Sequence, residues 1–201
     1  MVNEKINLKK QYSYVFRYLK DSKVHITLTT IFFLFFFILG FVFPYIASPE
    51  LYTQVSERIK EIVKELINET KDLNFFGLWW FILSNNALIS LISIFLGVFL
   101  GIIPGFLLLS NGLLIGLILS FVSIANGGDV NILYNLLPHG IFEIPAVIIS
   151  FALGIKLGSF MFYQNKRKAL NHLFRNSVRT FLLLIIPLLL IASIIETAMI
   201  F

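Results

Sequence analysis

The sequence lacks cysteine, and it has little charge. No cysteine occurs among its 201 residues, which excludes disulfide frameworks, thiolate zinc sites and cysteine nucleophiles. Only 13% of the residues are charged, whereas a soluble domain usually has about 25%. The composition therefore excludes a disordered chain, a basic nucleic-acid-binding domain and most soluble enzymes.

Apolar residues take the place of the missing charge. They make up 58% of the chain, 22 of them are phenylalanine, and the mean hydropathy is +0.88. A helix needs about 20 mostly apolar residues to cross the hydrocarbon core of a bilayer. We therefore predict an all-α, polytopic transmembrane bundle with about five spans, surrounded by lipid and with no nucleic-acid partner.

The apolar runs set the expected boundaries. A basic N-terminal segment (1–23) should precede spans over 24–46, 86–103, 106–125, 137–163 and 180–201. Ser84-Asn85-Asn86 interrupts the second run. As one helix, residues 75–103 would extend over ~40 Å, more than a core of about 30 Å needs. We therefore expect residues 75–84 to form an interfacial, half-inserted helix, and Pro104-Gly105 to form the turn before the third span.

Residues 48–74 have a different pattern. Apolar residues from Leu51 to Leu66 recur at spacings of three and four, and charged residues fill the other face. Ser48 before Pro49 and Glu50 is a typical helix start, because it offers a capping hydroxyl, a preset φ and an acidic first turn. This segment should be an amphipathic helix outside the membrane.

Basic residues are divided unequally between the two sides of the predicted bundle. Six lie in the segment 1–23 and five in the predicted loop 164–179, and Lys156 should snorkel to the same side. Because lysine and arginine favour the cytoplasmic side, we expect a cell-membrane protein with a cytoplasmic N-terminus. The helix over 48–74 and the C-terminus should then be extracytoplasmic.

Glycine recurs every four residues in the middle spans. Such spacing lets two helix backbones approach closely in a membrane. The glycines in these pairs are Gly97, Gly101, Gly105, Gly112, Gly116, Gly154 and Gly158. We expect spans two, three and four to meet along them.

Three ionisable residues lie inside predicted spans, where charge is costly. His139 and Glu143 are four residues apart and share one helix face. With the orientation above, Glu143 and Glu196 both fall in the outer third of the membrane, together with Asn85 and Asn86. We therefore predict an intramembrane polar cluster. Asn111 is a further polar residue, near the inner end of the third span.

Three interpretations of this cluster remain open at the level of sequence. It is a structural network, a proton or cation site in a permeation path, or a metal site of His139, Glu143 and Glu196. Against the metal, no second histidine lies at ligand spacing and no HExxH motif occurs. We predict no catalytic residue and no cofactor.

The segment Leu137-Pro138-His139-Gly140-Ile141-Phe142-Glu143-Ile144-Pro145-Ala146 closely resembles the signature of the stage II sporulation protein M family. The Leu109-Ser110-Asn111-Gly112 step, the Asn85-Asn86 pair and the closing Ala192 and Glu196 resemble that family too. The resemblance covers roughly residues 75–201. It implies a membrane subunit of the kind that, in sporulating bacteria, works in a complex with cell-wall hydrolases.

The favoured function is therefore a non-enzymatic membrane scaffold or complex subunit with cell-envelope partners. The amphipathic helix over 48–74 would supply a docking surface or lie on the leaflet. The alternative is an ion channel or a cation-coupled transporter that uses Glu143 and Glu196, as a dimer or larger homo-oligomer. A metal-dependent intramembrane enzyme is the third hypothesis.

Overall fold

The computed structural model describes the backbone of residues 8–127 and 132–201, and the side chains of 8–127 and 140–201. Five helices of this described part are long and apolar enough to cross a membrane, which confirms the all-α, polytopic prediction. In chain order the helices are α1 (Leu8–Asp21), α2 (Lys23–Ile46), α3 (Pro49–Thr70), α4 (Phe75–Leu96), α5 (Ile102–Ala125), α6 (Ile132–Gly158), the 3₁₀ turn η1 (Ser159–Phe162), α7 (Lys166–Thr180), the π turn η2 (Phe181–Ile185) and α8 (Ile186–Ile200).

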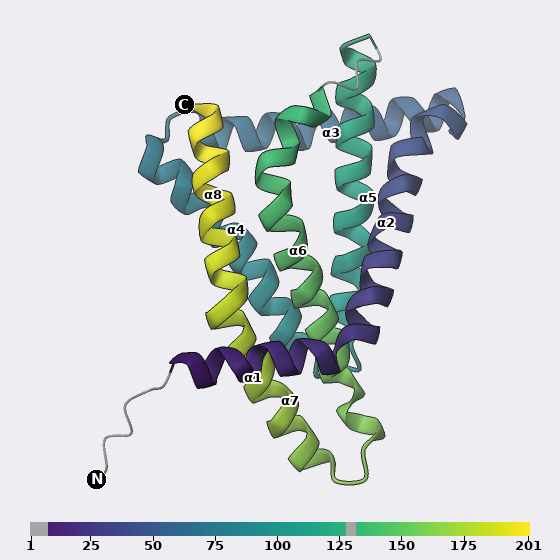
Figure 1. The fold of residues 1–201 in the computed structure, drawn as a ribbon. Coiled ribbons are helices and arrows are strands. Elements are labelled where there is room, and N and C mark those ends of the chain that lie inside the picture. The colour runs from purple at the N-terminus through teal and green to yellow at the C-terminus, as the bar shows by residue number, and fades with distance from the viewer. Residues whose placement is uncertain (1–7, 128–131) are drawn as a thin grey trace.

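The spanning helices α2, α4, α5, α6 and α8 form an upright bundle that two helices cross at opposite ends (Figure 1). Helix α1 lies across one end, where α7 also lies, and α3 lies across the other end, near the C-terminus. Large side chains such as Phe32, Phe35 and Phe106 are more than half exposed. Outward-facing apolar side chains of this kind are expected where the solvent is lipid.

Helix α3 begins as the sequence predicts. The Ser48 hydroxyl accepts a hydrogen bond from the Leu51 amide at 3.3 Å, and Pro49 occupies the first turn. These two features satisfy one free amide and remove another. At the other end, the Asn74 side chain accepts from the Gly77 amide at 2.9 Å and starts α4. The first cap lies where the chain turns from α2 into α3, and the second lies where it turns from α3 into α4.

Helix α4 corrects the predicted second span. It is one helix from Phe75 to Leu96, so the separate interfacial helix over 75–84 and the span over 86–103 were wrong. Ser84 does not break it, because its hydroxyl donates to the Phe81 carbonyl of the preceding turn at 3.1 Å. With 22 residues the helix is ~33 Å long, which suits a core of about 30 Å.

The turn between α4 and α5 also lies earlier than predicted. Leu100 and Gly101 have positive φ angles of 56° and 72°, which reverse the chain there. Pro104, which we expected in the turn, lies in the first turn of α5. A proline is tolerated at that position because a first-turn amide has no acceptor within its helix.

The predicted basic loop over 164–179 is largely a helix. Asn165 caps α7 by accepting from the Lys168 amide at 3.0 Å, and α7 continues through η2 into α8. The π turn ends two residues before Pro187, which has no amide hydrogen and would clash with the carbonyl four residues earlier in a regular helix. The wider turn accommodates the proline and preserves a continuous fifth span.

The glycines form two separate seams. Between α4 and α6, a Cβ on Gly97 would overlap the Gly154 carbonyl, and one on Gly158 would overlap the backbone of Gly101. Ser93 donates across the same seam to the Ser150 carbonyl at 3.3 Å. This part agrees with the expected meeting of spans two and four.

The second seam departs from the prediction. Gly112 and Gly116 of α5 face the first span, α2, at Phe33 and Phe37, and Gly40 of α2 meets Leu113 in return. Gly105, also expected in the packing, has no atom within 4 Å of an added Cβ. Spacing along a helix predicts a close approach but does not identify the partner helix.

Candidate functional site

A cavity of about 270 Å³ lies at the α3 end of the bundle, where four helices meet. Asn85 and Asn86 enter it from α4, Glu143 from α6 and Glu196 from α8. Leu66 and Thr70 of α3 complete its wall. Four of the residues predicted for the polar cluster therefore line one space, although they are separated by up to 111 positions in sequence.

The helices that carry the two carboxylates pack against each other and hold them at this end. Ala146 of α6 is fully buried three residues after Glu143, and Ala192 of α8 is buried four residues before Glu196. Thr197, next to Glu196, is fully buried and donates to the Ser193 carbonyl at 2.8 Å. Small side chains and side chains bonded within their own helix allow the backbones of α6 and α8 to approach closely. Both glutamates line the cavity and are only partly buried.

The polar side chains of this cavity are all able to accept hydrogen bonds. Ionised carboxylates only accept hydrogen bonds, whereas asparagine amides both donate and accept. Two glutamates and two asparagines are therefore groups of the types that can hold a proton, a hydrated cation or an ammonium group. Thr70 adds no free donor, since its hydroxyl already donates to the Leu66 carbonyl at 2.8 Å.

His139 lies outside the residues whose side chains are described, although its backbone belongs to α6. Among the described side chains, no group of three histidine or acidic residues comes together to hold a metal ion. The metal hypothesis therefore depends on His139 joining Glu143 and Glu196.

Asn111 does not belong to this cavity. Its amide nitrogen donates to the Leu107 carbonyl one turn earlier on α5, at 2.8 Å, and it is absent from the cavity lining. A local bond of this kind satisfies an asparagine in an apolar span without a partner helix. Asn111 is therefore separate from the Glu143 and Glu196 cavity.

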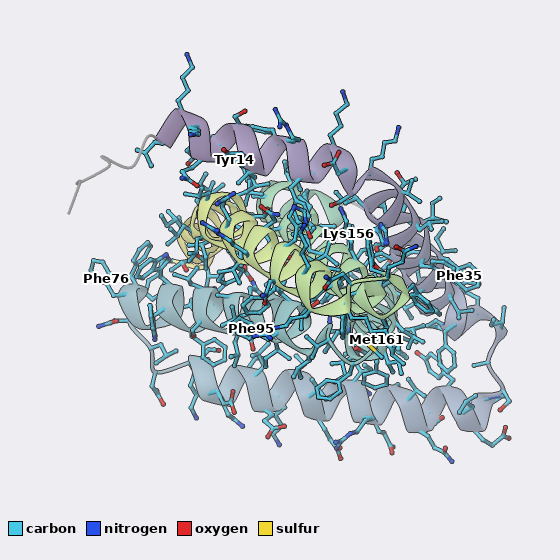
Figure 2. The ribbon with its side chains drawn as sticks, turned by 90° about the horizontal axis from the view of Figure 1, so that it is seen from below. Tyr14, Phe35, Phe76, Phe95, Lys156 and Met161 are labelled. Carbon is cyan, nitrogen blue, oxygen red and sulfur yellow. The ribbon has the colours of Figure 1, made fainter. Side chains whose placement is uncertain are left out.

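A second polar cluster, which the sequence did not predict, lies at the opposite end. Lys156 of α6 is only 7% exposed, so the expected snorkelling to the surface was wrong. Its Nζ donates to the Ser22 hydroxyl at 2.8 Å and lies 4.3 Å from the centre of the Tyr18 ring. In Figure 2 Lys156 lies inside the outline of the bundle, while Phe35 and Phe76 lie at its margin.

Tyr18 extends this cluster to α7. Its hydroxyl donates to the Leu173 carbonyl at 3.3 Å and lies 3.1 Å from the Ser177 hydroxyl. Burial raises the pKa of Tyr18 to about 12, so the hydroxyl keeps its proton and remains a donor. The sequence did contain a signal for the burial of Lys156. This lysine lies between Gly154 and Gly158, two glycines that were predicted to pack against another helix.

The sequence matches the family described as stage II sporulation protein M over residues 29–199. The chain belongs to the stage II sporulation protein M family. The match begins inside α2, so it starts before the resemblance over 75–201 and includes most of the first span and all of α3. Comparisons with curated proteins and with solved structures found no match.

Family membership and the five membrane-spanning helices of the described part make this chain a multi-pass membrane protein. The stage II sporulation protein M match contains both clusters except Tyr18 and Ser22, which precede it. The described residues that line the cavity with Glu143 and Glu196 lie within the family region except Ile200, whereas α1, which carries Tyr18, lies before it.

Proposed function

We propose that this member of the stage II sporulation protein M family is a non-enzymatic membrane subunit that organises partner proteins of the cell envelope. One observation carries the proposal: α3 lies across one end of the bundle with much of its apolar surface uncovered. Leu51, Ile62 and Leu66 are 45%, 37% and 49% exposed, and in α3 only Ser56 and Ile59 are buried. An amphipathic helix of this kind is a common docking element for another helix.

Photo-crosslinking from α3 in native membranes tests this proposal. A photoreactive amino acid at Ile62 lies at the exposed apolar edge, whereas one at the adjacent Glu61 lies about 100° away on the charged face. We expect adducts with an envelope protein from Ile62 and few from Glu61. Adducts only with lipid or with a second copy of this chain, or equal adducts from both positions, would refute the scaffold.

A second function, cation or proton permeation, is favoured by the cavity alone. Two carboxylates in an intramembrane cavity are typical of ion and proton pathways, and Glu143 and Glu196 share one of about 270 Å³. Five spans form a small unit, so this function would suit a dimer or larger assembly.

Flux measurements in liposomes test the second function. We expect proton, sodium or potassium flux from the unaltered protein, and its loss in Glu143→Gln and in Glu196→Gln. Glu65→Gln, on the exposed face of α3 and outside the cavity lining, serves as the matched control. Equal flux in all the variants, or none in any, would exclude this pathway for those ions.

A further inference from the structure

A larger cavity, of about 540 Å³, lies between α3 and α5. Ile59, Val63 and Ile67 of α3 form one wall, and Ile118, Phe121 and Val122 of α5 form the other. Its volume is within the range of about 300–1,000 Å³ that small-molecule sites occupy. It is separate from the cavity with Glu143 and Glu196, because no residue lines both.

One end of this groove is closed by an aromatic contact. The Tyr52 ring of α3 packs against Phe121 of α5, with 5.3 Å between the ring centres. From Tyr52 to Ile67, α3 borders the groove for ~22 Å. Val122 is 36% and Ile67 56% exposed, so the groove is open to its surroundings. Its α5 wall is formed by the last two turns of a spanning helix, at the depth where acyl chains meet headgroups.

Two lysines line the groove where it borders the charged face of α3. Lys60 and Lys64 are one turn apart on α3, and both border the cavity. Neither makes an ion pair with any described residue, and the nearby Glu61 is instead paired with Arg58 at 2.8 Å. An apolar groove with two ammonium groups at its mouth, neither held in an ion pair by a described residue, therefore lies at the bilayer interface.

We propose that α3 and α5 bind one anionic phospholipid of the surrounding bilayer. An acyl chain occupies the apolar groove, and the phosphate lies between Lys60 and Lys64. Basic residues near a membrane surface favour anionic lipid by about fivefold each, so the two lysines favour it by about 25-fold over a zwitterionic lipid with the same chains. The lipid fills the space that α3 and α5 leave between them.

Native mass spectrometry of the delipidated full chain tests whether the two lysines select an anionic headgroup. Phosphatidylglycerol and phosphatidylcholine with identical acyl chains are added in turn. We expect one tightly bound phosphatidylglycerol, at least tenfold preferred, and loss of that preference in Lys60→Gln/Lys64→Gln. Lys71→Gln, beyond the end of α3 and outside the groove lining, should keep it. Equal binding of both lipids, or a preference unchanged by the double substitution, would overturn the proposal.

Fluorescence quenching tests whether the acyl chain of the bound lipid lies in the groove. Because the chain has no cysteine, a fluorophore can be attached at Val63→Cys in the groove or at Glu65→Cys on the exposed face of α3. Phosphatidylglycerol brominated on its acyl chain should quench the first label at least threefold more than the second. Equal quenching at both positions, or dimerisation that excludes lipid from Val63→Cys, would overturn the proposal.

Discussion

Lys156 donates a hydrogen bond from Nζ to the Ser22 hydroxyl across 2.8 Å, at a point where both residues are buried. Ser22 in turn donates to the Tyr18 carbonyl at 2.6 Å. The lysine thus joins the end of α6 to the junction between α1 and α2. An ammonium group in this setting is stable only while its acceptors are in place.

Ser22→Ala should therefore destabilise the bundle. The substitution removes the acceptor of a charged donor, and we expect a loss of about 1.5–3 kcal/mol in the free energy of unfolding. Lys156→Met keeps an unbranched side chain of similar length and removes the charge, so we expect a smaller loss. Unfolding in mixed detergent, followed by circular dichroism, measures both.

The double variant distinguishes this hydrogen bond from simple packing. Without the ammonium group, Ser22→Ala has little left to disrupt, so Ser22→Ala/Lys156→Met should be no less stable than Ser22→Ala alone. Lys168→Ala, exposed on α7, should leave stability unchanged. Strictly additive losses would show that Ser22 and Lys156 act independently.

The seam between α4 and α6 should not tolerate a single methyl group. In Gly97→Ala the new Cβ would overlap the Gly154 carbonyl, which is backbone and cannot move aside. We expect a loss of about 1–3 kcal/mol, the usual effect of overpacking. Gly105→Ala is the matched control, because nothing lies within 4 Å of its added Cβ. Equal stability of the two variants would mean that the seam separates without cost.

The sequence was sufficient for the features that depend on composition and local chemistry. Apolar runs predicted the number of spans, and Ser48-Pro49 predicted the start of α3. Depth within the membrane was enough to suggest that Asn85, Asn86, Glu143 and Glu196 lie at one level, and the structure places them around one cavity. Their chemical role stays a prediction.

The remaining features depend on contacts between distant segments. Ser84 and Asn86 resemble a helix break, yet a hydroxyl bonded to its own helix and amides facing a cavity leave α4 continuous. Likewise, Gly112 faces α2, the first span, rather than the second or fourth span that its spacing had suggested. Lys156 remains buried because Ser22, 134 residues earlier, lies within hydrogen-bond distance. No local pattern contains these partners.

The contact between Tyr52 and Phe121 should hold α3 against the bundle. Such aromatic pairs contribute about 0.5–1.5 kcal/mol, so Tyr52→Ala should speed amide hydrogen exchange in α3 by about two- to tenfold. Exchange in α5 should not change. Tyr45→Ala, at the exposed end of α2, is the control for loss of a tyrosine at the same end of the bundle. Unchanged exchange in Tyr52→Ala would place the attachment of α3 elsewhere.

The orientation in the membrane is testable because the chain has no cysteine of its own. The basic residues of α1 and α7 lie at one end of the bundle and α3 lies at the other (Figure 1), so the positive-inside rule predicts that α3 is extracytoplasmic. A membrane-impermeant maleimide should label Glu65→Cys in intact cells, and Lys168→Cys only after permeabilisation. The reverse pattern would place α3, with the groove beside Lys60 and Lys64, on the cytoplasmic leaflet. Any partner docking on α3 would then have to be cytoplasmic.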